Sequence, residues 1–199
     1  KKLMQTSNDC IYRETLYLSS MNDIFPDFFF RNHRIIMKDK TQISTPLAIH
    51  TETVKPEWID HNGHMNSAYY VLAFDEAGTS LFRYFGITDE YRAKEKNGIF
   101  VGDYHIHYLR EVIEGDPLRF THLIIDCDEK KVHYWQEMFH ATDGYLAAQC
   151  EAIMLHTDLN TRRVSPFPSN AFSRIQSVHT VHAKAPRPDN LGRVIRMRK

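Results

Sequence analysis

The chain has 199 residues, 42% of them hydrophobic, and its 25 basic and 25 acidic side chains give a formal net charge of zero. This length suits one domain with tails, and the apolar content is high enough for a folded core, which excludes an intrinsically disordered chain. No run approaches the roughly 18 apolar residues of a membrane span, so we expect no membrane partner.

The first 44 residues differ in pattern from the rest. Their aromatic residues follow neither a helical nor a strand period, so we expect residues 1–44 to form a loosely ordered extension. No apolar stretch with a cleavage site follows the basic start, which argues against a secretory signal. Cys10, Cys127 and Cys150 are far apart and form no C-x-x-C motif. We therefore expect reduced thiols in a cytoplasmic protein, with no disulfide framework and no zinc site.

A strand and a long helix are predicted next. Residues 46–54 alternate enough for a strand, which Pro56 ends. After a polar loop, Asn66 or Ser67 can cap a helix that runs to about Phe85.

The predicted helix is unusually apolar, beyond one amphipathic face. We expect other structure to cover most of its sides. Gly78 lies inside it, where glycine costs about 1 kcal/mol relative to alanine, so close backbone packing is the expected compensation. Gly86 follows the last apolar residue as the expected C-terminal cap.

The rest of the middle region predicts an antiparallel sheet. A charged connector at 89–97 is followed by a period of two, and the motifs EGDP, DEKK and TDG supply turns between strands. The predicted strands cover residues 99–112, 118–127, 132–141 and 145–157. In the first of them we expect one face to carry Phe100, Tyr104, Ile106 and Tyr108, and the other Asp103, His105 and His107. One helix packed on an antiparallel sheet is an α+β plan for a domain at residues 45–159.

Charge is unevenly distributed between this domain and the end of the chain. Residues 45–159 carry 9 Lys and Arg against 19 Asp and Glu, whereas residues 160–199 carry 9 against a single acid. We expect a basic C-terminal tail that lies on the body, with a short helix at 171–182. The tail could bind an anionic partner, or it could simply balance charge.

The loop PEWIDHNGHMNSAYY, residues 56–70, concentrates polar side chains immediately before the apolar helix. Buried polar groups need hydrogen-bond partners, so such a cluster beside the core suggests that the loop has a functional role. It resembles the D-x-x-G-h-x-N loop of hotdog-fold thioesterases, the 4-hydroxybenzoyl-CoA thioesterase-like superfamily. The matching residues are Asp60, Gly63, His64, Met65, Asn66 and Tyr70. YLREVIEGDPL (108–118) resembles that family's entry into its third strand, and the resemblance spans residues 46–158. More narrowly, VKPEWIDHNGHM, the DG before the last strand and RPDNLGRVI resemble the betainyl-CoA thioesterase branch, which also occurs fused to carnitine dehydrogenases.

The resemblance implies a hotdog fold, in which an antiparallel sheet wraps around one long central helix. It implies hydrolysis of an acyl-CoA thioester to a free acid and coenzyme A, with betainyl-CoA or a related short acyl-CoA as substrate and no cofactor. It also implies a homodimer or homotetramer with the active site at the dimer interface. The alternatives are a non-catalytic acyl-CoA-binding hotdog protein and a hotdog dehydratase.

Asp60, Gly63 and His64 are the expected catalytic residues. Asp60 could attack the thioester carbonyl or act as a base for water, and the alternative is an Asx-turn that it forms together with Asn62. Backbone amides around Gly63 and His64, at a helix N-terminus, could bind the carbonyl oxygen as charge develops on it. A direct chemical role for the His64 side chain stays open.

The expected substrate-binding residues are Asn62, Asn66, Tyr70, Arg162 and Arg163. Asn66 could instead be only a helix cap, and Tyr70 could be core or the wall of an acyl pocket. The tail arginines suit the phosphates of coenzyme A, and Arg187 and Arg193 are further candidates.

We expect neither a metal ion nor a nucleic acid as a partner. Asp103, His105 and His107 share a strand face, but no carboxylate–His spacing of a known zinc enzyme is present, so we expect no metal. No RNA or DNA motif is visible and the body is acidic, so we expect no nucleic acid.

Overall fold

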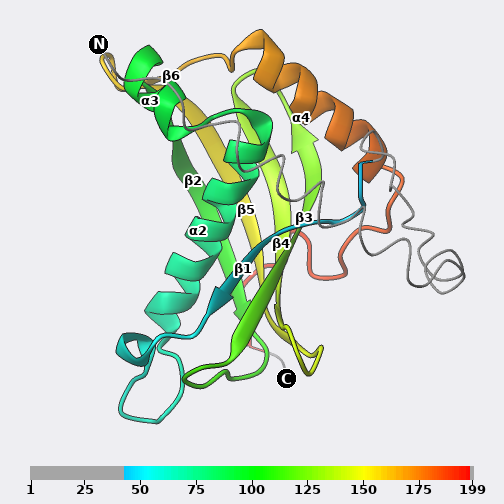
Figure 1. Cartoon of the computed structure of the whole chain (residues 1–199). Helices are drawn as coiled ribbons and strands as arrows, with labels where there is room; N and C mark the ends of the chain where they lie inside the picture. Colours follow the sequence, from blue (N-terminus) through cyan, green and yellow to red (C-terminus); the bar gives the residue numbers. More distant parts are fainter. Residues whose placement is uncertain (1–42, 198–199) are drawn as a thin grey trace, which may run out of the picture. The chain divides into compact units, whose positions relative to one another are not determined.

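An antiparallel sheet with one long helix across its inner face forms the folded body (Figure 1). The structure is a computed structural model that describes residues 43–197, so nearly all of the predicted 1–44 extension lies outside the described residues. The sheet order is β1-β3-β4-β5-β2, and the short β6 pairs with the end of β5. The strands are β1 (Leu47–Thr53), β2 (Asn97–Tyr108), β3 (Pro117–Cys127), β4 (Lys131–His140), β5 (Leu146–Asp158) and β6 (Arg163–Val164).

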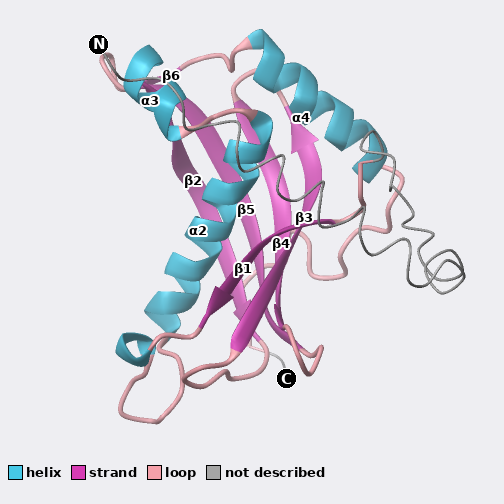
Figure 2. Cartoon of the chain, viewed as in Figure 1, coloured by secondary structure: helices cyan, strands magenta, loops and turns pink. Residues whose placement is uncertain are grey.

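Helix α2 (Ser67–Phe85) lies along the inner face of the sheet (Figure 2). Asn66 is its N-cap, because the Asn66 side chain accepts a hydrogen bond from the amide of Ala68. Gly86 ends the helix in the left-handed region with φ 96°. The predicted helix and its C-terminal glycine are confirmed, and of the two predicted caps Asn66 is used.

Two polar side chains of the sheet contact backbone carbonyl groups of α2. His122 Nε2 lies 3.0 Å from the carbonyl oxygen of Ala77, and Gln136 Nε2 donates to the carbonyl of Phe74 at 3.2 Å. Both side chains are fully buried, and burial lowers the pKa of His122 to about 4. The ring is therefore neutral at physiological pH, so it adds no uncompensated charge to the core.

Gly78 lets α2 pass close to the side chains of the sheet. A Cβ at this position would lie 2.8 Å from the hydroxyl oxygen of Tyr134, which projects from β4 and is fully buried. The predicted close packing at Gly78 is therefore present.

We expect Gly78→Ala to lower the free energy of unfolding by about 1–2 kcal/mol, because overpacking a rigid core outweighs the roughly 1 kcal/mol gain in helix propensity. In a Tyr134→Phe background the clashing hydroxyl is gone, so the same change should become neutral or stabilising. Urea unfolding of the two single variants and the double variant measures this coupling. Equal effects of Gly78→Ala in both backgrounds would contradict it.

The chain from the end of α2 through β2 differs from the prediction in two ways. The charged connector contains a helix, α3 (Asp89–Glu95), which Thr88 caps and which has no buried residue. A bulge in β2 then shifts the pairing with β5 between Val101 and Asp103. It places Phe100 on the opposite face from Tyr104, so the predicted common face is wrong at Phe100. An inserted residue inverts the alternation, and periodicity alone does not reveal it.

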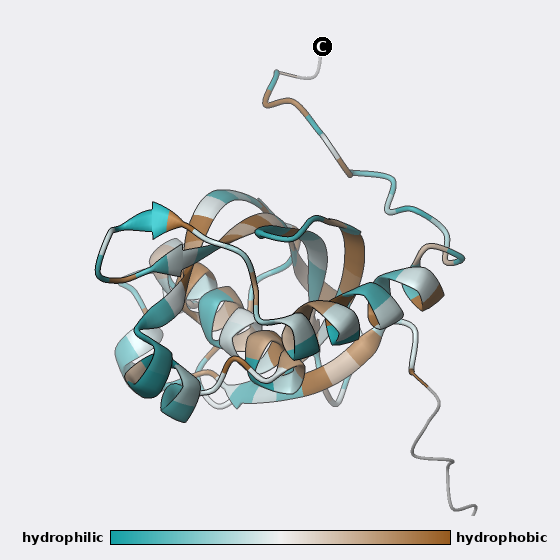
Figure 3. Ribbon diagram, turned by 90° about the horizontal axis from the view of Figure 1, so that it is seen from above, coloured by the Kyte–Doolittle hydropathy of each residue, from teal (hydrophilic) through white to brown (hydrophobic). Residues whose placement is uncertain are grey.

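The chain after β5 returns to the sheet. Helix α4 (Ser169–His182) buries Ala171, Ile175, Val178 and His182. His182 Nδ1 accepts from the backbone amide of Ile124 at 2.9 Å, at a bulge in β3. Farther on, the segment crosses the outer face of the sheet, where Arg187 donates to the carbonyl of Ile125 and Asn190 to the side chain of Gln149. The last described residues then lead away from the body, with Val194 and Ile195 exposed (Figure 3).

Candidate active site

The polar loop between η1 (Pro56–Trp58) and α2 is closed at its base by backbone contacts. Ile59 and Met65 form an antiparallel bridge, and the Asn66 amide donates to the carbonyl of Trp58 at 2.9 Å. Trp58 is buried and stacks on Tyr69. The polar residues 60–64 are therefore held at a fixed place beside the N-terminus of α2.

Asp60 lies at the start of this loop with its carboxylate turned back toward the chain. One oxygen accepts from the Asn62 amide at 2.8 Å, and the other lies 3.5 Å from the Asn66 side-chain nitrogen. The Asx-turn weighed as an alternative role is therefore present. The turn uses one carboxylate oxygen, and the second oxygen remains available because its contact to Asn66 is long.

The surroundings of Asp60 favour its charged form. The hydrogen bond from the Asn62 amide is the main cause that lowers the pKa of the carboxyl below its ordinary value of 3.8, and the nearby His64 and His61 act in the same direction. As pH falls from neutral, Asp60 therefore keeps its charge to below the usual range for an aspartate. A group held in this way is available as an anion wherever the protein works near neutral pH.

Some backbone amides in the loop donate hydrogen bonds within the loop, and others do not. The Gly63 amide donates to the carbonyl of Asp60 at 3.0 Å, so this expected donor is used within the turn. Gly63 has φ +82°, in the left-handed region, and a Cβ would meet nothing within 4 Å. Backbone conformation therefore explains the glycine. The amides of His61 and His64 donate no hydrogen bond within residues 43–197, and the His64 amide is the one nearer to α2 that a ligand oxygen could take.

The His64 ring lies between Asp60 and the neighbouring cavity. Its Nδ1 is 3.9 Å from a carboxylate oxygen of Asp60 and 3.3 Å from the carbonyl oxygen of Met65. The ring is partly exposed, so it can reach a bound ligand as well as Asp60.

A cavity of about 310 Å³ opens beside the loop. His64 and Ser67 line it together with Tyr70, Tyr108 and Arg110. Tyr70 is buried and packs edge-on against Tyr108 at 5.2 Å between ring centroids. The structure thus brings Asp60, Asn62, Gly63, His64, Asn66 and Tyr70 together around one end of α2.

The two tail arginines predicted to bind substrate lie elsewhere. Arg162 and Arg163 are exposed and follow β5 at the end where Asp158 pairs with Asn97, the first residue of β2. The Asp60 loop is at the opposite end of α2. Within one chain, the structure does not bring these arginines to Asp60.

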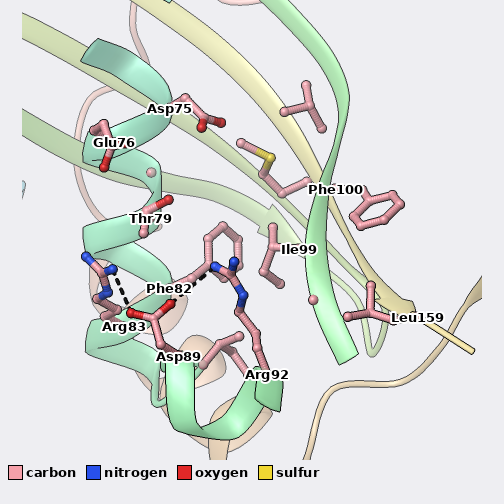
Figure 4. A pocket seen from close by; sticks show the side chains of 15 residues that line it. Asp75, Glu76, Thr79, Phe82, Arg83, Asp89, Arg92, Ile99, Phe100 and Leu159 are labelled. Atoms are coloured by element: carbon pink, nitrogen blue, oxygen red, sulfur yellow. Dashed lines mark hydrogen bonds and ion pairs between the residues drawn. The ribbon is translucent and has the colours of Figure 1, made fainter. Parts of the chain in front are cut away.

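A second cleft, about 430 Å³ in volume, lies between α2 and β2 toward the far end of the helix. Asp75, Glu76 and Thr79 line it from α2, and Ile99 and Phe100 line it from β2 (Figure 4). Sequence reasoning did not single out these acids. A signal was present, because Asp75 and Glu76 are the only acidic residues in a helix that is mostly apolar.

Neither a metal site nor a membrane span is found in the described part of the chain. Within residues 43–197 no three His, Cys, Asp or Glu side chains are grouped so that they could hold a metal ion. His105 and His107 contact each other, and His133 contacts Glu151 at 2.9 Å. Among those same residues, no helix is long and apolar enough to cross a membrane.

Residues 54–175 match the family model of the thioesterase-like superfamily. The betainyl-CoA thioesterase of Pseudomonas aeruginosa is 29% identical over 153 residues, which cover 77% of this chain and 96% of that one. The L-carnitine dehydrogenase/betainyl-CoA thioesterase of Rhizobium meliloti is 29% identical over 150 residues, which cover 75% of this chain but 30% of that longer protein.

Solved structures show the same arrangement of elements. A Staphylococcus aureus protein, determined in complex with CoA, superposes with a TM-score of 0.71 at 28% identity. The match covers 79% of this chain and all of that one.

Proposed function

The chain belongs to the thioesterase-like superfamily, and on that premise we propose that it hydrolyses an acyl-CoA thioester to a free acid and coenzyme A at the Asp60 loop. The predicted family and the predicted hotdog fold are confirmed. Acyl-CoA hydrolysis agrees with the named relatives and with the neighbour that binds CoA. The placement of the chemistry at Asp60 is our proposal.

One observation carries this placement: a carboxylate kept ionised lies beside an unpaired backbone amide at a helix N-terminus. Asp60 supplies the negative charge, and the His64 amide can donate to the thioester oxygen as charge develops there. The partial positive charge at the start of α2 adds to that stabilisation. Together they supply an attacking group and an oxyanion site.

Of the two roles open to Asp60, we favour nucleophile. The second carboxylate oxygen has only the long contact to Asn66, so it is free to attack a thioester carbon placed beside it. This oxygen would bond to the thioester carbon as the carbon–sulfur bond breaks, and the CoA thiolate would leave and take a proton. Water would then attack the Asp60 carbonyl carbon of the mixed anhydride, giving the free acid and restoring Asp60. Single-turnover hydrolysis in ¹⁸O-water tests this, because ¹⁸O recovered in Asp60 requires this anhydride, whereas a water activated by a general base would label only the product acid.

Thiol release from a panel of acyl-CoA substrates tests the function itself. Hydrolysis gives one equivalent of free CoA thiol for each acid formed. A non-catalytic acyl-CoA-binding protein would release none, and a dehydratase would alter the acyl chain with the thioester intact. Betainyl-CoA belongs in the panel as the acyl-CoA named for two relatives.

Pairing of two chains along β2 is the assembly that we propose. Strand β2 is an edge of the sheet, with β5 as its partner within the described residues. Large apolar side chains are exposed along it, including Val101 at 47% and Tyr108 at 51%. An unpaired edge with exposed apolar groups suits a second copy. An antiparallel two-fold pairing would place the Tyr108 end of one β2 beside the Asn97 end of the other.

This pairing gives the basic residues after β5 a role. Arg162 and Arg163 flank the Asn97 end of β2, so a dimer would carry them toward the Asp60 loop of the partner chain. We propose that they contact the phosphates of the CoA bound there. Arg187 already donates to the carbonyl of Ile125 and is assigned a structural role.

Arg163→Ala is expected to raise KM about three- to tenfold while kcat changes little, because phosphate contacts far from the carbonyl are similar in the ground and transition states. Added salt should raise KM of the unmodified protein by screening the same contacts. Arg187→Ala is the comparison, since it should lower the melting temperature and leave KM alone. Unchanged KM in both Arg163→Ala and Arg162→Ala would remove these residues from the binding site.

We also place the enzyme in the cytoplasm. Cys127 and Cys150 are free thiols, which suits a reducing compartment.

A further inference from the structure

The cleft between α2 and β2 has an apolar wall and an acidic wall. Phe82, Ile99 and Met154 supply apolar surface, and Asp75 projects toward it from α2, where Glu76 also lines the cleft (Figure 4). Its volume of about 430 Å³ falls within the usual range of small-molecule sites. No residue of the Asp60 loop lines it.

Some charged residues of the cleft form ion pairs, and others do not. Arg83 and Arg92 both pair with Asp89, at 2.9 and 3.6 Å, at one end of the cleft. Neither Asp75 nor Glu76 has an ion-pair partner within 4.0 Å among residues 43–197. Burial and the neighbouring Glu76 raise the pKa of Asp75, as expected for a partly desolvated carboxylate without a cation beside it.

Buried hydroxyls converge on the same wall. Tyr134 is fully buried, and its hydroxyl lies 2.8 Å from the place of a Gly78 Cβ, with the Tyr104 hydroxyl 3.8 Å from that point. Neither hydroxyl has a hydrogen bond of good geometry in the described part of the chain, although the two hydroxyls lie close enough to each other to affect each other's pKa. The Tyr104 hydroxyl is near enough to Asp75 to offset part of the rise in its pKa. Gly78 lines the cleft, so these polar groups gather at its floor beside a carboxylate that has no ion-pair partner among residues 43–197. Such an arrangement indicates a ligand with a charged group.

We propose that this cleft is the acyl subsite of the thioesterase and that it selects acyl groups ending in a positive charge, with Asp75 as the specificity-determining residue. The inference rests on the proposed function. A quaternary ammonium group has no N–H to donate, so it is recognised by a carboxylate together with apolar and aromatic surface. The cleft offers both, through Asp75 and through Phe82.

The reach of a short acyl group requires that the subsite serve the partner chain. Asp75 lies eight residues beyond Ser67, which is about 12 Å along a helix that rises 1.5 Å per residue. A betainyl group is far shorter than this between its carbonyl carbon and its nitrogen. The proposed β2 pairing removes the difficulty, because it brings the cleft of one chain beside the Asp60 loop of the other.

The test compares two acyl-CoA substrates of nearly the same shape. Betainyl-CoA carries a trimethylammonium group, and 3,3-dimethylbutanoyl-CoA has a carbon in place of that nitrogen and no charge. Asp75→Asn keeps the size of the side chain and removes its charge. We expect the ratio of kcat/KM for the charged over the neutral substrate to fall at least about tenfold, because the attraction between opposite charges is lost in a partly desolvated site. Asp75→Glu should recover much of the ratio.

Asp126→Asn is the matched control, because Asp126 is exposed on β3 and, within residues 43–197, its side chain accepts a hydrogen bond only from the amide of Cys127. It should leave the ratio unchanged. An unchanged ratio in folded Asp75→Asn, or a wild-type protein that prefers the neutral substrate, would overturn the subsite while leaving the thioesterase proposal intact. Failure to release thiol from either substrate would overturn the proposed function itself.

Mixing two defective chains tests the sharing of the site. Co-expressed Asp60→Asn and Asp75→Asn chains would form mixed dimers in which one composite site has both native residues. Random pairing should restore about a quarter of wild-type activity on betainyl-CoA, since half of the dimers would have one of two sites intact. Activity no higher than that of the two variants measured separately would contradict a subsite contributed by the partner chain.

Discussion

Asp60→Asn is expected to lower kcat for thioester hydrolysis by at least about a hundredfold, the scale on which a positioned nucleophile or base acts. The substitution removes the charge but keeps an oxygen that can accept from the Asn62 amide, the 2.8 Å bond that shapes the loop. The loop and the N-terminus of α2 should therefore stay in place. Steady-state thiol release measures the loss, and the melting temperature reports whether the fold is retained.

Asp128→Asn provides the control. Asp128 forms the same kind of turn, with its side-chain oxygen accepting from the Lys130 amide at 2.7 Å, but it lies between β3 and β4, far from α2 in the sequence. The Asp128→Asn variant should hydrolyse acyl-CoA with a kcat close to that of the wild-type protein. If folded Asp60→Asn does the same, Asp60 is only a turn residue and the chemistry must lie elsewhere.

The fold was readily predicted because its elements have strong local signals. The apolar period of α2, its polar cap at Asn66 and the glycine at its end are all present in the sequence. The features that were missed depend on particular geometry. The bulge that inverts Phe100 is set by pairing with β5. Helix α3 has only seven residues and contacts the core through Tyr91, which is too little to give an apolar stripe in the sequence.

The candidate site was only partly predictable, for a related reason. The Asp60 loop is contiguous in sequence, and its residues stay neighbours in the structure. The cleft instead joins Asp75 on α2 to Ile99 on β2 and Met154 on β5, and such a meeting is created by folding. Occupation of the Gly63 amide by the carbonyl of Asp60 is likewise a matter of backbone conformation, which residue types alone do not give.

Val101→Lys is expected to dissociate the protein into single chains and to reduce hydrolysis nearly to background. Val101 lies near the middle of β2, at the open edge of the sheet, and is 47% exposed. A lysine there places a hydrated charge, repeated by symmetry, where two edges would meet, which is how natural sheets prevent edge pairing. Because the proposed site takes Asp60 from one chain and the cleft from the other, separate chains would lack a complete site. Light scattering gives the mass, and thiol release gives the activity.

Val101 also lines the cleft, so the variant needs a test that separates dissociation from a blocked subsite. Dissociation depends on concentration: the specific activity of Val101→Lys should rise as the protein is concentrated, in step with the fraction of dimer. A blocked subsite would give the same low activity at every concentration. Val101→Thr, which keeps the branched shape without the charge, should remain a dimer with nearly full activity. Single Val101→Lys chains with wild-type activity would show that each chain holds a complete site, and the proposed pairing would then have no catalytic role.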